Sequence, residues 1–146
     1  MKSWILASLL MIAPLAAHHG NHDDHDDNGA GQTHGYTTIH TDELKGWYDQ
    51  GKAFILIDAR SKPYFEGTLL PKAKWVPADA SDADIKAALP SKETTVVVYC
   101  SGTECPASKW LADRLVKLGY TNVYKYPEGL SEWISKGYPT TSTKKS

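Results

Sequence analysis

The sequence predicts an α/β fold, with a single domain built on a mainly parallel central sheet and helices on both faces. Two apolar runs, residues 53–57 and 94–99, have apolar side chains on both strand faces, which is typical of buried parallel strands. Segments with helical spacing alternate with these strands. The 146 residues, 41% hydrophobic with a formal charge of −1, suit one domain of ordinary composition.

The helix boundaries follow from capping and turn residues. We expect a strand over 36–40 and then a helix that Thr41 caps, with acidic residues in the first turn. Ser81 and Asp84 have the spacing of a capping box, and Pro90 ends that helix. Gly119 follows a helical pattern at the position where a positive φ is expected. Further expected elements are a helix over 110–118, a strand over 122–126 and a short helix over 130–136.

Residues 1–17 have the pattern of a secretory signal peptide. Lys2 precedes an apolar run that ends in the small residues Ala16 and Ala17. The run is shorter than the roughly 20 residues that span a bilayer, although an uncleaved anchor is the alternative. We therefore expect a periplasmic or secreted protein with no stable membrane insertion after cleavage.

Residues 18–35 are rich in histidine, aspartate and glycine and are expected to be disordered, because they offer almost no apolar surface to bury. Their imidazoles are weak candidate ligands for Zn, Cu or Ni. A solvated acidic leader is the alternative, and no cofactor is required. The balanced charge of the chain excludes the basic excess that nucleic-acid binding needs. The candidate metal ligands are His18, His19, His22 and His25.

The candidate site is a cysteine at a strand end. Cys100 ends the strand over 94–99, and a small polar loop, residues 101–107, leads into the next helix. Ligands of parallel α/β sheets bind beyond the carboxyl ends of the strands. Backbone N–H groups of such a loop stabilise negative charge, so we expect a lowered pKa and a nucleophilic Cys100 thiolate. An inert buried cysteine, or a structural disulfide with Cys105, is the alternative.

Several dispersed motifs resemble those of the rhodanese-like sulfurtransferase family, in the same order along the chain. The resemblance covers about residues 36–140, so we expect this range to be the domain and 141–146 to be a flexible tail. The motifs are Ile57 to Arg60 with Tyr64, Gly67 and Pro71 to Ala73; Val96 to Cys100; Leu118 to Tyr120; Asn122 to Tyr124; and Gly129, Trp133 and Gly137 to Pro139.

The resemblance implies that Cys100 accepts sulfane sulfur from a small donor, holds it as a persulfide and passes it to a thiol or cyanide. It also implies a substrate-binding loop of Ser101, Gly102, Thr103 and Glu104. We assign Asp58 and Arg60, which match family positions, to support of this loop. The loop departs from the family pattern because it has no arginine after the cysteine and includes Glu104. Thiosulfate, which such an arginine would bind, is therefore a doubtful donor.

Cys105, five positions after Cys100, adds a second chemistry. It is a candidate resolving thiol that forms a disulfide with Cys100. Two alternatives to sulfur transfer follow: a thiol–disulfide redox protein with its own partner protein, and a non-enzymatic module in which the histidine segment binds a metal or a partner.

Overall fold

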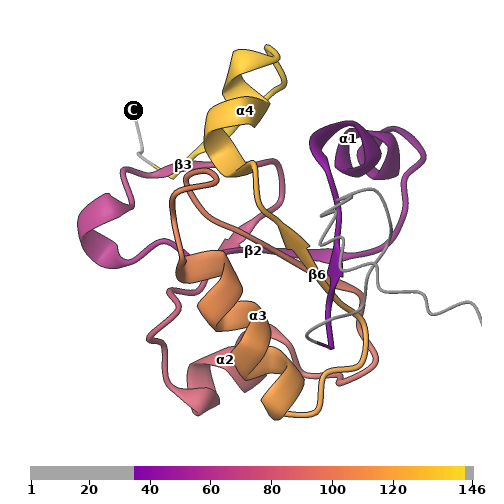
Figure 1. Ribbon diagram of the computed structural model, residues 1–146, viewed down its shortest axis with the longest axis vertical. Coiled ribbons are helices and arrows are strands. Elements are labelled where there is room, and N and C mark those ends of the chain that lie inside the picture. Colours follow the sequence, from indigo (N-terminus) through magenta and orange to yellow (C-terminus); the bar gives the residue numbers. More distant parts are fainter. Residues whose placement is uncertain (1–34, 144–146) are drawn as a thin grey trace, which may run out of the picture.

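The computed structural model describes residues 35–143, and these build a five-stranded sheet in which all neighbouring strands are parallel. The expected signal peptide and the histidine segment lie outside the described residues, apart from Gly35. The strand order is β1, β6, β5, β2, β4, which puts β5 at the centre (Figure 1). The sheet comprises β1 (Thr37–Thr38), β2 (Ile55–Asp58), β4 (Lys74–Trp75), β5 (Val96–Tyr99) and β6 (Val123–Tyr126).

Helices cover both faces of the sheet, so the predicted fold class is confirmed. Figure 1 shows α2 and α3 on one side and α1 and α4 on the other. A 3-10 turn, η1 (Lys62–Tyr64), follows β2. The helices are α1 (Thr41–Asp49), α2 (Asp82–Ala88), α3 (Ala107–Lys117) and α4 (Gly129–Ser135).

Alternation of side chains along the central strands divides the core into two layers. On one face, Val96 and Val98 pack with Leu111 and Leu115 of α3. On the other face, Val97 and Tyr99 pack with Leu44 and Trp47 of α1 and with Trp133 of α4. All four residues of β5 are 0% exposed, which explains why this strand is apolar on both faces.

Two of the predicted helix boundaries are confirmed in detail. The Ser81 hydroxyl accepts a hydrogen bond from the Asp84 amide at 3.1 Å and donates to the Asp84 carboxylate at 2.7 Å, at the start of α2. Gly119 has a φ of 91° just after α3. Both features are local, which is why residue type alone predicts them.

Thr41 does not cap α1, and this prediction was wrong. His40 occupies the N-cap position, and Thr41 is the first helical residue. The Thr41 hydroxyl is buried and lies 2.8 Å from the Tyr126 hydroxyl. A buried hydroxyl needs a hydrogen-bond partner, and this tertiary partner takes the place of the capping interaction.

The chain end forms a small second sheet. Thr141 and Ser142, which the sequence analysis placed in a flexible tail, form β7 (Thr141–Ser142) and pair antiparallel with β3 (Thr68–Leu69). The Thr143 amide continues the pairing by donating to the Gly67 carbonyl at 2.9 Å. Backbone pairing of this kind depends on a distant segment, so the polar composition of the tail does not reveal it.

Candidate active site

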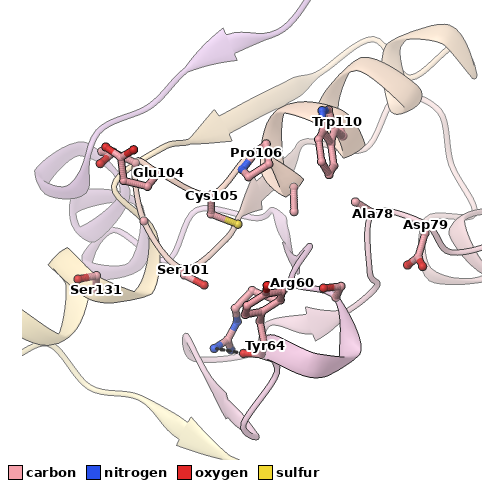
Figure 2. Close-up of a pocket in the computed structure, with 14 residues that line it drawn as sticks. Arg60, Tyr64, Ala78, Asp79, Ser101, Glu104, Cys105, Pro106, Trp110 and Ser131 are labelled. Atoms are coloured by element: carbon pink, nitrogen blue, oxygen red, sulfur yellow. Dashed lines mark hydrogen bonds between the residues drawn. The ribbon is translucent and has the colours of Figure 1, made fainter.

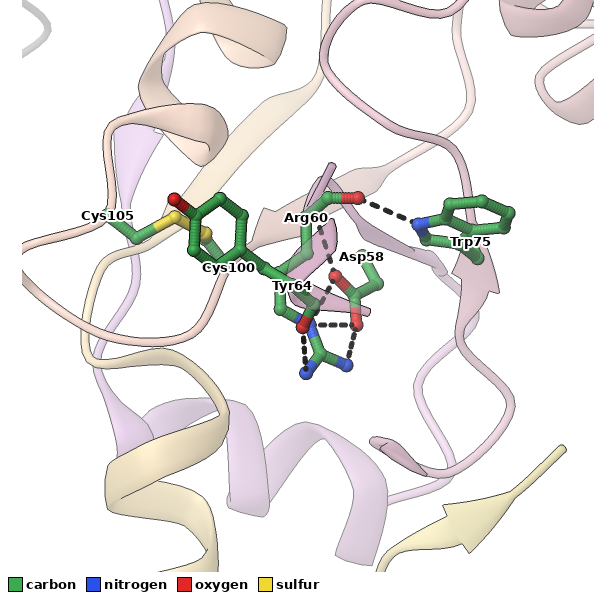
Figure 3. Close-up of a disulfide and its surroundings, with 6 residues drawn as sticks. All are labelled: Asp58, Arg60, Tyr64, Trp75, Cys100 and Cys105. Carbon is green, nitrogen blue, oxygen red and sulfur yellow. Dashed lines mark hydrogen bonds and ion pairs between the residues drawn. A yellow bond between two sulfur atoms is a disulfide. The ribbon is translucent and has the colours of Figure 1, made fainter. Parts of the chain in front are cut away.

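The site begins where the central strand ends. Cys100 directly follows β5, is 1% exposed and packs into the core layer that includes Leu111. Its sulfur is bonded to Cys105, with 6.1 Å between the two Cα atoms (Figure 3). The expected nucleophilic thiolate is therefore not the state that the structure describes. A sulfur in a disulfide does not titrate, so this expectation concerns the reduced protein and stays a prediction.

The loop after Cys100 is fixed by the start of α4. The Leu130 amide donates to the Cys100 carbonyl at 3.0 Å, and the Ser131 amide donates to the Ser101 carbonyl at 2.8 Å. Because N–H and C=O point in opposite directions across a trans peptide, the amides of Ser101 and Gly102 point away from these two donors. The cysteine loop thus has a defined backbone orientation.

Gly129 permits this close approach. It has a φ of 63°, and a Cβ atom there would collide with the Cys100 carbonyl oxygen and lie 2.9 Å from the Gly102 nitrogen. Glycine tolerates the left-handed backbone, and it needs no space for a Cβ atom. Gly129, one of the residues that resemble the family pattern, therefore allows the start of α4 to approach the cysteine loop closely.

A pocket of about 830 Å³ lies beside the disulfide. Figure 2 shows the Cys105 sulfur pointing into this pocket, between the cysteine loop and Tyr64. Cys105 is partly exposed, and it lines the pocket with the four residues predicted to bind substrate, Ser101, Gly102, Thr103 and Glu104. Cys100 is not among the residues that line it. The other walls come from Arg60, Ser61 and Tyr64 on one side and from Ala78, Asp79, Pro106, Ala107, Trp110 and Ser131 on the others.

Asp58 and Arg60 form a buried ion pair behind the pocket. Arg60 Nη2 lies 2.6 Å from Asp58 Oδ2, and Arg60 Nε donates to both carboxylate oxygens at 3.0 Å. The same guanidinium donates to the Thr68 carbonyl at 2.5 Å, and Trp75 Nε1 donates to the Arg60 carbonyl at 2.7 Å (Figure 3). The hydrogen bonds of Arg60 beyond the pair therefore run to the segment after β2. Arg60 lines the pocket opposite the cysteine loop, so the pair fixes the facing wall.

Two aromatic residues of the pocket were not predicted as site residues. Tyr64 is 70% exposed and Trp110 is 58% exposed, and both line the pocket. The buried side chains of α3 are Ala107, Ser108, Leu111, Ala112 and Leu115. A helical projection would have separated Trp110 from this face, because it shares its side of the helix with Arg114 and Lys117.

Residues 35–143 contain no cluster of three or more histidine, cysteine or acidic side chains placed to bind a metal. The predicted histidine ligands, His18, His19, His22 and His25, lie before this range. Within the same range, no helix is both long enough and apolar enough to cross a membrane.

Comparison with solved structures gives the same fold. Protein BH2092 from Bacillus halodurans is 23% identical, with a TM-score of 0.66 over 75% of this chain and 78% of that one. A thiosulfate sulfurtransferase from Pseudomonas aeruginosa is 19% identical, with a TM-score of 0.61 over 73% of this chain and 20% of that one. A persulfide form of EanB with ergothioneine is 23% identical, with a TM-score of 0.60 over 73% of this chain and 28% of that one.

A sequence comparison with curated proteins returns no match. The family model for the rhodanese-like domain matches residues 40–136, which is more than half of the chain. This range runs from the residue before α1 to the residue after α4, and it contains both cysteines and all residues that line the pocket. The chain therefore belongs to the rhodanese-like domain family.

Proposed function

We propose that the protein is a sulfurtransferase that carries sulfane sulfur as a persulfide on Cys100. The observation that supports this most directly is the disulfide, because it brings the Cys100 sulfur to bonding distance of a residue that lines the pocket. A sulfur atom taken up by Cys100 would occupy the space that the Cys105 sulfur vacates after reduction. The membership in the rhodanese-like family and the similarity to a thiosulfate sulfurtransferase fold agree with this activity.

In the proposed reaction, the Cys100 thiolate attacks the outer sulfur of a donor R–S–S⁻. The new bond is Cys100–S, the donor S–S bond breaks, and R–S⁻ leaves with the electron pair. The amides of the loop then stabilise the persulfide anion on Cys100. A thiolate or cyanide acceptor attacks the same outer sulfur and releases the Cys100 thiolate, so the cycle consumes no electrons.

The disulfide is the oxidised resting state in this proposal, and reduction by two electrons activates the protein. A second candidate function, thiol–disulfide exchange with a partner protein, is favoured by the position of Cys105 at the pocket.

We also propose an exported location, since the disulfide persists in oxidising compartments. A separate proposal concerns the segment before the domain: the histidines there bind Zn, Cu or Ni loosely. If this binding were the protein's main role, the protein would be a non-enzymatic metal- or partner-binding module. The histidines are His18, His19, His22 and His25.

The experiment compares wild type, Cys100→Ser and Cys105→Ser in cyanide-dependent thiocyanate formation, each after reduction and removal of the reductant. We expect Cys100→Ser to lose the activity and Cys105→Ser to keep it. Mass spectrometry of the protein incubated with donor alone should show one extra sulfur atom on Cys105→Ser and none on Cys100→Ser. If no donor loads Cys100, while both substitutions abolish dithiol reductase activity, thiol–disulfide exchange is the function instead.

A further inference from the structure

The disulfide presents its two sulfurs unequally to the solvent. Cys100 is 1% exposed and belongs to the core, whereas Cys105 is partly exposed and lines the pocket. Thiol–disulfide exchange requires that a thiolate reach one of the two sulfurs. In the oxidised protein, the sulfur that an incoming thiolate can reach is the one on Cys105 (Figure 2).

The charges of the pocket disfavour a ligand with an anionic group in addition to its reacting sulfur. Among the described residues that line it, Arg60 is the one cation, and its side chain is 5% exposed and paired with Asp58. Two carboxylates, Asp79 and Glu104, lie at the exposed part of the lining. The lining of the main pocket therefore carries more exposed negative charge than exposed positive charge.

Two lysines lie beside this pocket and not in its lining. Lys109 and Lys125 line a second hollow of about 210 Å³ that shares residues 103–106 with the main pocket. Lys109 is already engaged, because its Nζ lies 2.8 Å from Asp113 Oδ2. Glu104 and Cys105 line both hollows, so these lysines reduce the negative charge at Cys105. They do not remove it from the main pocket, because neither lysine lines that pocket and Asp79 lies outside the second hollow.

The remaining lining is largely apolar. Tyr64 and Trp110 contribute exposed rings, and Ala78, Pro106 and Ala107 contribute aliphatic surface. Such a lining favours a ligand with an apolar body, because the ligand and the exposed rings both lose apolar surface to water on binding.

We propose that the pocket admits a small thiol whose only negative charge is that of its reacting thiolate, and that this thiol opens the disulfide by attacking Cys105. The inference deepens the proposed function, on which it rests, by naming the reductant class that frees Cys100. The thiolate R–S⁻ forms a bond to the Cys105 sulfur, the Cys100–Cys105 bond breaks, and Cys100 leaves as the thiolate. A second R–S⁻ then attacks the sulfur of the mixed disulfide that came from the first thiol. This gives R–S–S–R and the Cys105 thiolate.

The test measures how fast the oxidised protein is opened by thiols of similar size and different charge. The probes are cysteamine, 2-mercaptoethanol and 3-mercaptopropionate, with benzyl mercaptan as an uncharged aromatic thiol. Rates are expressed per thiolate and divided by the rate for the same disulfide in urea-unfolded protein, so that intrinsic reactivity cancels. We expect this ratio to be roughly tenfold higher for cysteamine than for 3-mercaptopropionate at low salt, and the difference to shrink as salt is added.

Variants assign the preference to the pocket. The double variant Asp79→Asn, Glu104→Gln should lose most of the charge preference, whereas Glu43→Gln, an exposed carboxylate on α1, should keep it. Trp110→Ala should slow benzyl mercaptan more than 2-mercaptoethanol. Equal ratios for all charges, or a higher ratio for 3-mercaptopropionate, would overturn the inference.

The point of attack is read separately. Samples are quenched early with iodoacetamide, and fragmentation of the peptide that contains both cysteines locates the adduct. We expect the mixed disulfide on Cys105 and the alkyl group on Cys100, and the reverse pattern would overturn the inference. These readouts need no sulfur donor, so a protein that opens as expected but never transfers sulfur would refute the proposed function and leave this inference standing.

Discussion

Substitution of Gly129 by alanine tests how the cysteine loop is held. In the structure, the added Cβ would collide with the Cys100 carbonyl, and α4 would have to move away from the loop. The two hydrogen bonds from Leu130 and Ser131 to the loop carbonyls would then be lost. We expect Gly129→Ala to destabilise the folded protein more than the backbone conformation alone would require.

The magnitude follows from two contributions. A left-handed backbone costs an alanine roughly 1–2 kcal/mol. Each lost hydrogen bond adds about 1 kcal/mol. Gly129→Ala should therefore lower the free energy of unfolding by about 3–4 kcal/mol. Gly51→Ala is the matched control, because Gly51 has a φ of 64° and no atom within 4 Å of the added Cβ, so it should lose only about 1–2 kcal/mol.

The assay is urea unfolding of both variants with the disulfide intact. The entropy that alanine removes from the unfolded chain is the same at both positions and cancels in the comparison. Equal losses of stability in the two variants would refute the reasoning, since they would show that α4 does not need to approach the loop so closely.

Three further predictions concern stability. Asp58→Ala should cost about 3–5 kcal/mol, because it leaves the buried Arg60 charge unpaired, and urea unfolding measures the loss. Ser81→Ala should cost about 1 kcal/mol through loss of the cap on the Asp84 amide, and an unchanged unfolding midpoint would contradict this. Burial raises the pKa of Tyr126 from 10.0 to about 12, so the folded state keeps a proton that the unfolded state has lost. The contribution of Tyr126 to the free energy of unfolding is therefore complete below pH 10 and falls by about 1.4 kcal/mol per pH unit as the pH rises toward 12. The difference in the free energy of unfolding between wild type and Tyr126→Phe, measured across this range, should show this fall.

The sequence was informative where a feature depends on local pattern. The double-faced apolar strand over 94–99, the Ser81 cap and the turn at Gly119 were predicted because each depends on neighbouring residues. The four loop residues predicted to bind substrate line the pocket because their position after a central parallel strand fixes where they lie.

Features that depend on distant contacts were missed. Thr41 meets Tyr126 across 85 positions of sequence, so its role could not be derived from helix-cap preference. The burial of Cys100 and the exposure of Cys105 also depend on packing, because α3 and α4 bring their own contacts to the two ends of the loop. The sequence therefore singled out the two cysteines that the structure joins in a disulfide, and not which of them faces the solvent.

The pairing of β7 with β3 connects Thr141 and Ser142 to one wall of the candidate site. β3 continues the segment that carries Tyr64, which lines the pocket. The Thr68 carbonyl of β3 also accepts a hydrogen bond from the Arg60 guanidinium at 2.5 Å. Loss of the β3–β7 pairing would therefore loosen this wall of the pocket while the disulfide itself stayed in place.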